Sequence, residues 1–359
     1  MTTISGMPSG YGLLGRVLAD SASVRNRLDT LTRQASSGLI ADTYSGLAAG
    51  ASVSLSIDPQ VTALKTGQAN IDAANGRMQV TQMALTQIQS IAASFQSQLM
   101  NLNGLNPTNV DSVAASARAA LTQVAALLNT KDGDVYVFAG EDTTNPPVPN
   151  PDAITTSGFF TQIQSAVSQL SASGAAATTA ATLSIARSDT PGTTPFSAYL
   201  SGGTAARPVV ESGDGQRPAT GLLANANGAI ASTGASTTGS YMRDLMRSLA
   251  TLGSLTSAQS GDVGFSDVVQ DTRTSLGGTI SAMAADAGVL GNTQTGLAAT
   301  KASLGDTITA LTGQVAASRD ADMASVLSNL TQTQTLLQAS YQIIGTVNGL
   351  SLVKFLPAS

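Results

Sequence analysis

Two long stretches of the chain carry an apolar residue at every seventh position, and this spacing limits what the chain can fold into. In the later stretch the row is Leu276, Met283, Leu290, Leu297, Leu304 and Leu311. A second row lies four residues after members of the first, at Ile280, Ala287, Ile308 and Val315. Together the rows form the two apolar positions of a heptad repeat. Its length predicts a long helix that packs lengthwise against another helix.

The earlier stretch has a matching pattern far upstream. Its row is Leu64, Ile71, Met78, Leu85, Ala92 and Leu99, with Ile88, Phe95 and Leu102 at the companion positions. We expect the two stretches to return to each other and their rows to form one bundle seam. The expected fold is mainly α: a long antiparallel coiled-coil helical bundle formed by the N- and C-terminal regions, with an inserted α+β central domain. Two polar residues, Gln294 and Lys301, interrupt the seam. They either specify its register or lie where its packing loosens, and we favour a role in register.

The composition removes several classes of function. Aromatic residues make up 4% of the chain and Trp is absent, which suits thin helical bundles. The net charge of −5 and the scattered basic residues argue against nucleic-acid binding. The chain has no Cys and no His, so disulfides, thiolate nucleophiles and the commonest general base and metal ligand are excluded. We therefore expect no cofactor and no metal.

The sequence shows neither the pattern of a cleaved secretory signal nor that of a membrane-spanning helix. Residues 1–11 lack the basic-then-apolar order of a cleaved secretory signal, and no run approaches 18 apolar residues. We expect no membrane insertion. The protein should be cytoplasmic, or should leave the cell by a route without a cleaved signal.

Taken in order, the chain divides into five expected segments. Residues 1–60 form an N-terminal assembly helix and loop, and residues 61–133 form the N-terminal half of the helical bundle. Residues 134–240 form a variable central α+β domain, where Pro, Gly, Ser and Thr are frequent. Residues 241–318 form the C-terminal half of the bundle, and residues 319–359 form a C-terminal assembly helix.

Local signals refine these segments. The first helix should end at Gly38, and a loop should follow up to Pro59, which marks the start of the long helix. Asp132-Gly133 predicts a turn, and residues 135–138 read as a short strand. A short helix is expected over residues 159–170.

Both ends of the chain resemble the bacterial flagellin family, which includes filament flagellins and hook–filament junction proteins. Near the N-terminus, Leu31 and the segment Ala35-Ser36-Ser37-Gly38-Leu39-Ile40 are similar to the small-residue segment after that family's first helix. Near the C-terminus, Leu330-Thr331-Gln332 and Gln334-Thr335-Leu336-Leu337-Gln338-Ala339-Ser340-Tyr341 resemble its final helix.

Within the family, two segments resemble those of the junction proteins, which are hook-associated proteins. The first is Val137-Phe138-Ala139-Gly140 followed by Thr143-Thr144-Asn145-Pro146-Pro147, and the second is Leu350-Ser351-Leu352-Val353-Lys354-Phe355-Leu356. The family's acidic Asp-Asp-Pro stretch is absent in its usual form. A longer segment, residues 44–56, precedes Ile57-Asp58-Pro59 instead.

The resemblance implies a structural protein of the flagellum that supports motility. It implies export through the flagellar secretion channel with an export chaperone, and assembly with copies of itself, hook-associated protein and flagellin. Pattern alone leaves open whether the terminal helices complete the bundle or stay disordered until assembly; the resemblance favours assembly. The assembly residues we expect are Val24, Leu28, Leu31, Ser37, Gly38, Leu327, Leu330, Leu337, Tyr341, Ile344, Leu350 and Leu352.

Other functions have weaker support. Ser351-Leu352-Val353-Lys354 and Lys65-Thr66-Gly67 match short patterns of serine β-lactamases, but in reversed order, and such patterns arise by chance. We expect no enzyme and no catalytic residue. A filament flagellin is the alternative within the family. A non-flagellar secretion or signalling coiled-coil protein is the remote alternative.

Overall fold

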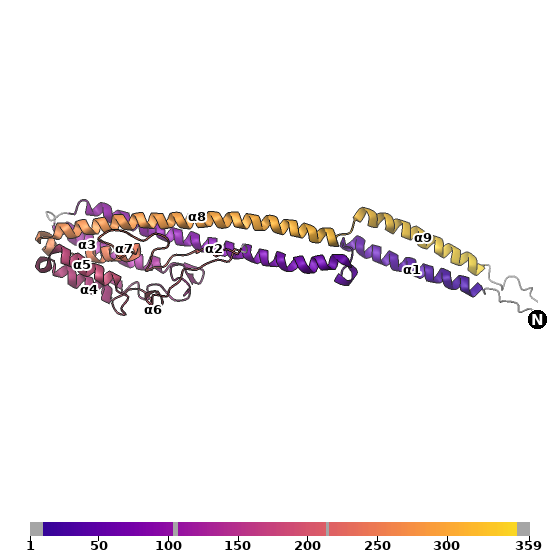
Figure 1. Cartoon of the computed structure of the whole chain (residues 1–359), viewed down its shortest axis with the longest axis horizontal. Coiled ribbons are helices and arrows are strands. Elements are labelled where there is room, and N and C mark those ends of the chain that lie inside the picture. The colour runs from indigo at the N-terminus through magenta and orange to yellow at the C-terminus, as the bar shows by residue number, and fades with distance from the viewer. Residues whose placement is uncertain (1–9, 103–106, 213–214, 350–359) are drawn as a thin grey trace, which may run out of the picture. The chain divides into compact units, whose positions relative to one another are not determined.

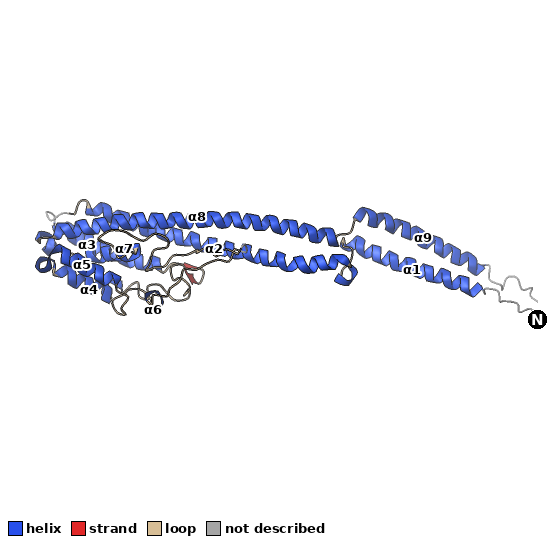
Figure 2. Cartoon of the chain, in the orientation of Figure 1, coloured by secondary structure: helices blue, strands red, loops and turns tan. Residues whose placement is uncertain are grey.

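The computed structural model describes residues 10–102, 107–212 and 215–349. Its described parts are mainly helical, as the sequence predicts (Figure 2). The chain divides into two compact units, residues 1–63 with 306–359, and residues 64–305. Helices α2 (Ala49–Leu99) and α8 (Phe265–Arg319) contribute residues to both units.

In the first unit, α1 (Gly10–Ser37) and α9 (Met323–Gly349) lie side by side (Figure 1). Gly38, at a φ of +72°, ends α1, because the left-handed conformation stops a helix and favours glycine. The Gly38 carbonyl then accepts a hydrogen bond from the Ala321 N–H at 2.8 Å. The Ile40 N–H donates to the Arg319 carbonyl at 2.7 Å. These two bonds join the end of α1 to the residues before α9.

The expected loop up to Pro59 is wrong in its second half. A short 3₁₀ turn, η1 (Tyr44–Gly46), is followed by α2, which begins at Ala49 and contains Pro59. A proline inside a helix costs about 3 kcal/mol because it lacks the N–H and crowds the preceding turn. Here Ser54 and Ile57, in the turns just before Pro59, are buried, so packing offsets that cost. A glycine- and serine-rich stretch gave no periodicity from which to predict this.

In the second unit, residues 64–99 of α2 pair with residues 265–305 of α8 in antiparallel order. Gln68 bonds to Lys301 near one end, and Gln96 lies against Gly277 near the other. The heptad rows are buried between the helices: Ile71, Met78, Leu85, Ile88, Ala92, Leu276 and Met283 are each at most 1% exposed. Leu290, Leu297 and Leu304 are at most 6% exposed.

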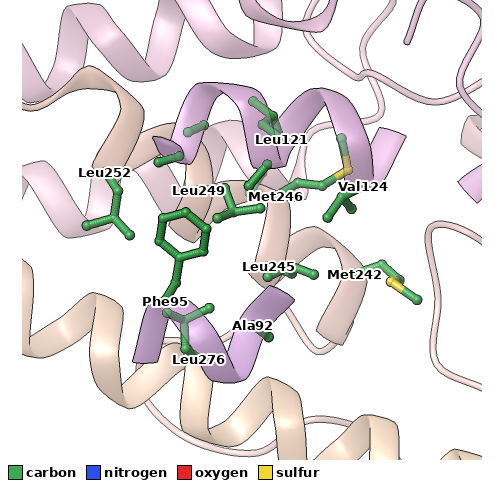
Figure 3. Close-up of a cluster of buried hydrophobic side chains, with 14 of the residues drawn as sticks. Ala92, Phe95, Leu121, Val124, Met242, Leu245, Met246, Leu249, Leu252 and Leu276 are labelled. Carbon is green, nitrogen blue, oxygen red and sulfur yellow. The ribbon is translucent and has the colours of Figure 1, made fainter. Parts of the chain in front are cut away.

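A larger core lies where two shorter helices join this pair. Helices α3 (Pro107–Leu128) and α7 (Tyr241–Ser254) pack on each other and on α2 and α8. Figure 3 shows side chains from these helices meeting: Ala92, Phe95, Leu121, Val124, Met242, Leu245, Met246, Leu249, Leu252 and Leu276. Every residue of α7 is buried. This core is built mainly from Leu, Met, Val, Ile and Ala, and several of the chain's few aromatic side chains, among them Phe95 and Tyr241, lie in it.

The central region contains short elements joined by turns. Strands β1 (Lys131–Asp132) and β2 (Val135–Tyr136) form a small antiparallel hairpin around Gly133, so the expected strand is shorter than residues 135–138. Helices α4 (Gly158–Ser168), α5 (Leu170–Arg187) and α6 (Ala198–Ser201) follow, and the 3₁₀ turns are η2 (Ile154–Thr156) and η3 (Ser257–Gly261). The apolar residues 183–185 lie inside α5. Single bridges join Val209 to Ala219 and Ala139 to Leu223.

Candidate assembly interface

The contact face between α1 and α9 is narrow and partly polar. On α1, Leu31 is 8% exposed, and Val24 and Leu28 are half-buried. On α9, Val326 is buried, and Leu330, Leu337 and Ile344 are half-buried. The most buried side chains on this face are small hydroxyls, Ser21 and Thr333, at 2% each. Of the large apolar side chains described on this face, only Leu31 and Val326 are buried, so the face gains less from burial in a single copy of the chain than the seam does.

The predicted apolar stripe of α9 is split by the structure. Leu330, Leu337 and Ile344 face α1, but Leu327 and Tyr341 are 52% and 46% exposed. At about 100° per residue, these two lie together on one side of the contact face. Sequence reasoning treated all five as one stripe, because residues at heptad-like spacing share a broad face.

Two further apolar side chains were missed and lie on the opposite side of that face. Leu336 and Ile343 are 50% and 51% exposed and lie seven residues apart. Leu18 of α1 is 55% exposed as well. The spacing of Leu336 and Ile343 was a usable signal. The outer apolar side chains of α9, which we call the α9 outer residues, are Leu327, Leu336, Tyr341 and Ile343.

The charge distribution of the two helices is unequal. From Met323 to Gly349 the sequence has no Asp, Glu, Lys or Arg. By contrast, α1 carries arginines at positions 16, 25, 27 and 33. The Arg25 guanidinium lies over the Tyr341 ring at 5.4 Å, a cation–π contact between the helices. An uncharged helix with exposed Leu, Ile and Tyr side chains is suited to burial against another chain.

Asp322 caps the start of α9. Its Oδ1 accepts hydrogen bonds from the N–H groups of Ala324 at 3.0 Å and Ser325 at 3.3 Å, and its Oδ2 accepts from the Ser325 hydroxyl at 2.8 Å. The Ser325 hydroxyl and N–H lower the pKa of the Asp322 carboxyl, because these bonds stabilise its charged form. The Asp322 carboxylate therefore acts as the N-cap of the uncharged helix α9.

The remaining predicted assembly residues lie at the corner after α1 or beyond the described part. Ser37 is exposed; its hydroxyl donates to the Arg33 carbonyl at 2.9 Å and accepts from the Leu39 N–H at 3.2 Å. Gly38 is half-buried at the end of α1. A cavity of about 260 Å³ is lined by this corner, including Gln34 and Ile40. Leu350 and Leu352 lie outside the described residues.

The predicted seam residues are placed as follows. Ile71, Met78, Leu85, Leu276, Met283, Leu290, Leu297 and Leu304 are buried, and Leu64 is half-buried beside them. Leu311, in the first unit, is half-buried. Lys301 reaches across to α2, where its Nζ contacts the Asp72 carboxylate oxygens at 2.5 and 2.7 Å. Gln294 is half-buried.

Buried charges on α7 were missed by sequence reasoning. Arg247, 1% exposed, donates to the Asp271 carboxylate at 3.2 Å and to the Ser236 carbonyl at 3.1 Å. Arg243 donates to the Asp189 carboxylate at 2.5 Å. Their partners are 24 and 54 residues away, so the sequence shows no pairing. The spacing of two arginines by four in an apolar helix was the available signal.

A buried carboxylate holds a loop of the central region against α8. Asp286, 1% exposed, accepts hydrogen bonds from the N–H groups of Gly228 at 2.5 Å and Ala229 at 2.8 Å. Burial raises the pKa of the nearby Tyr241 hydroxyl, and the negative charge of Asp286 raises it further. These buried charges tie the central region to α7 and α8, which is a structural role.

The described residues were also compared with the patterns of a metal site, a membrane span and a catalytic site. They contain no group of three His, Cys, Asp or Glu residues that could hold a metal, and Asp132-Gly133 lies at the predicted turn, where Asp132 ends β1 and Gly133 begins the turn to β2. Among the same residues, no helix has the length and apolar character needed to span a bilayer. Lys65, of the β-lactamase-like pattern, is exposed on α2.

A helical seam that brings distant parts of the chain together, with terminal helices that leave apolar side chains outside, defines a structural subunit. The bacterial flagellin N-terminal helical region matches residues 18–143, and the bacterial flagellin C-terminal helical region matches residues 274–356. These matches cover more than half of the 359 residues. No curated protein matches the chain.

The chain belongs to the bacterial flagellin family. Members are structural, non-enzymatic subunits that support motility and self-assemble into the polymers of the flagellum, an extracellular appendage.

Proposed function

We propose that this chain joins the flagellar hook to the filament. The support is the resemblance of two segments to junction proteins. One of them, residues 137–147, is a packed part of the central region: Phe138 is fully buried and its carbonyl accepts from the Ala224 N–H at 3.0 Å. The Pro147 carbonyl accepts from the Ser197 N–H at 2.8 Å. The segment that resembles the junction proteins therefore contributes to the folding of the central region.

The single observation that carries assembly is the exposure of the α9 outer residues on an uncharged helix. A single copy of the chain leaves these side chains about half in water. Neighbouring copies, hook-associated protein or flagellin would bury them, and each fully buried Leu or Ile contributes about 1.5–3 kcal/mol. In this proposal α1 and α9 are the assembly helices, and the α2–α8 seam holds each subunit together. Export through the flagellar channel with a chaperone completes the proposal.

Location in the flagellum tests the junction role. Intact flagella would be labelled with immunogold and an antibody raised against residues 141–240. We expect a single band where hook meets filament. Label along the whole filament would instead identify a filament flagellin. The absence of label on flagella that bind a control antibody would refute both roles.

A pair of adjacent leucines tests the assembly surface. Leu336 is 50% exposed, whereas Leu337 is half-buried against α1. We expect Leu336→Ser to keep the helicity of the monomer and to raise the subunit concentration needed for polymerisation, measured by sedimentation. Leu337→Ser, the matched control, should reduce monomer helicity. Normal polymerisation of Leu336→Ser would show that α9 is not an assembly surface.

A further inference from the structure

A row of amide side chains runs along one flank of the seam. On α2, positions 68, 75, 82, 89 and 96 are Gln, Asn, Gln, Gln and Gln. On α8, positions 277, 284, 291, 298 and 305 are Gly, Ala, Gly, Ala and Gly. Both rows have the heptad period, so they follow the seam along its length in the second unit.

Contacts show that the two rows face each other. A Cβ added to Gly277 would lie 2.9 Å from Gln96 Nε2, and one added to Gly305 would lie 3.3 Å from Gln68 Nε2. At Gly291 the corresponding distance, to Gln82, is 3.8 Å. Each step of fourteen residues along α2 therefore matches an equal step back along α8.

Direct bonds near one end fix the same alignment. The Gln68 Nε2 donates to the Lys301 carbonyl at 3.0 Å. The Lys301 side chain forms its ion pair with Asp72, one turn along α2 from Gln68. The Gln68 side chain and the Lys301 carbonyl thus form a specific hydrogen bond between α2 and α8. Apolar packing alone is less specific about which residues lie opposite each other.

The apolar rows cannot by themselves define the register. A slip of one heptad moves one helix about 10 Å along the other and still places apolar positions opposite each other. The flank rows distinguish the two arrangements. A slip in one direction would place Gln82 against Ala284 and Lys301 against Lys65; a slip in the other would place Lys301 against Gln79. The ion pair with Asp72 is lost in both.

We propose that the amide row of α2, the three α8 glycines that face it (Gly277, Gly291 and Gly305) and the Lys301–Asp72 pair determine the register of the seam. Glycine is among the poorest helix formers. At these three positions the amide of a glutamine lies where a larger side chain would extend, whereas the other glycines of α8 have no atom within 4 Å of an added Cβ. This inference concerns the pairing of α2 with α8 and stands independently of the junction role.

Glycine replacements in α8 test the contact, because two sites in this helix differ in what they face. Gly277 faces Gln96, whereas Gly288 has no atom within 4 Å of an added Cβ. Gly288→Ala should raise the melting temperature by about 2–4 °C through better helix propensity. Gly277→Ala should raise it less or lower it, and the two should become equal in a Gln96→Ala background. Equal gains in the native background would overturn the proposal.

Cross-linking tests the register directly, since the chain has no cysteine of its own. Asn75→Cys with Ala298→Cys reports the observed register, and Asn75→Cys with Gly291→Cys reports a slip of one heptad. In the native background we expect only the first pair to form a cross-link with a short bis-maleimide. Adding Gln68→Ala, Gln96→Ala and Lys301→Ala should lower its yield at least about twofold and let the second pair react. Identical yields in both backgrounds would refute register control.

Discussion

Replacement of one seam leucine tests the packing of α2 against α8. Leu290 is 4% exposed, in a small cluster with Ile71, Met78, Leu297 and Val210. Leu290→Ala removes the buried side chain and leaves a cavity, which costs 2–5 kcal/mol in protein cores. Because this cluster is small and can partly collapse, we expect about 2–3 kcal/mol. For a unit of this size, that loss lowers the melting temperature by about 5–10 °C.

The neighbouring residue supplies the control. Val289 is 38% exposed, so Val289→Ala should change the free energy of unfolding by less than about 1 kcal/mol. Leu290→Asp should destabilise more than Leu290→Ala, because it places an unpaired charge in the seam. Circular dichroism at 222 nm during urea and thermal unfolding measures all three. Equal stability of the two alanine variants, or full helicity and an unchanged melting temperature for Leu290→Asp, would refute the seam pairing.

Three further predictions concern single side chains. Arg247→Met removes the buried cation that pairs with Asp271, whose side chain is 16% exposed, and should cost about 3 kcal/mol in urea unfolding. Arg217→Met, which breaks an exposed ion pair, should cost under about 1 kcal/mol. Hydrogen bonds lower the pKa of the Asp322 carboxyl in the folded chain. Its stabilisation of α9 is therefore present above the unfolded carboxyl pKa of about 4 and is lost as the pH falls through the lower folded pKa. Circular dichroism should show that Asp322→Ala lacks this loss of helicity in acid. Gly140→Ala should lower the melting temperature more than Gly133→Ala, because both have positive φ but only at Gly140 would the Cβ meet a backbone oxygen, at 2.5 Å.

The sequence predicted those parts of the fold whose pattern repeats. The seam follows from heptad spacing, since residues seven apart on a helix share a face whatever lies around them. The end of α1 followed from Gly38, where glycine permits the left-handed conformation that stops a helix. These signals are local, and they need no knowledge of distant partners.

Features that depend on distant contacts could not be predicted. The start of α2 at Ala49 overrides the local signal of Pro59, because buried neighbours in the first unit stabilise the helix. The burial of Arg247 depends on partners from other segments. On α9, periodicity indicated an apolar helix, but only the placement of α1 shows that Tyr341 lies at the edge of the contact face, beside Arg25 and about half exposed.

Hydrogen exchange of the monomer and of the assembled polymer tests the central claim most directly. In the monomer, we expect slow exchange at amides of residues 71–99 and 276–304 and fast exchange over residues 323–346, because α9 buries little in a single copy. In the polymer, residues 323–346 should become as slow as the seam. If α9 is already as protected as the seam in the monomer, or if its exchange is unchanged by polymerisation, then α9 is not the assembly helix.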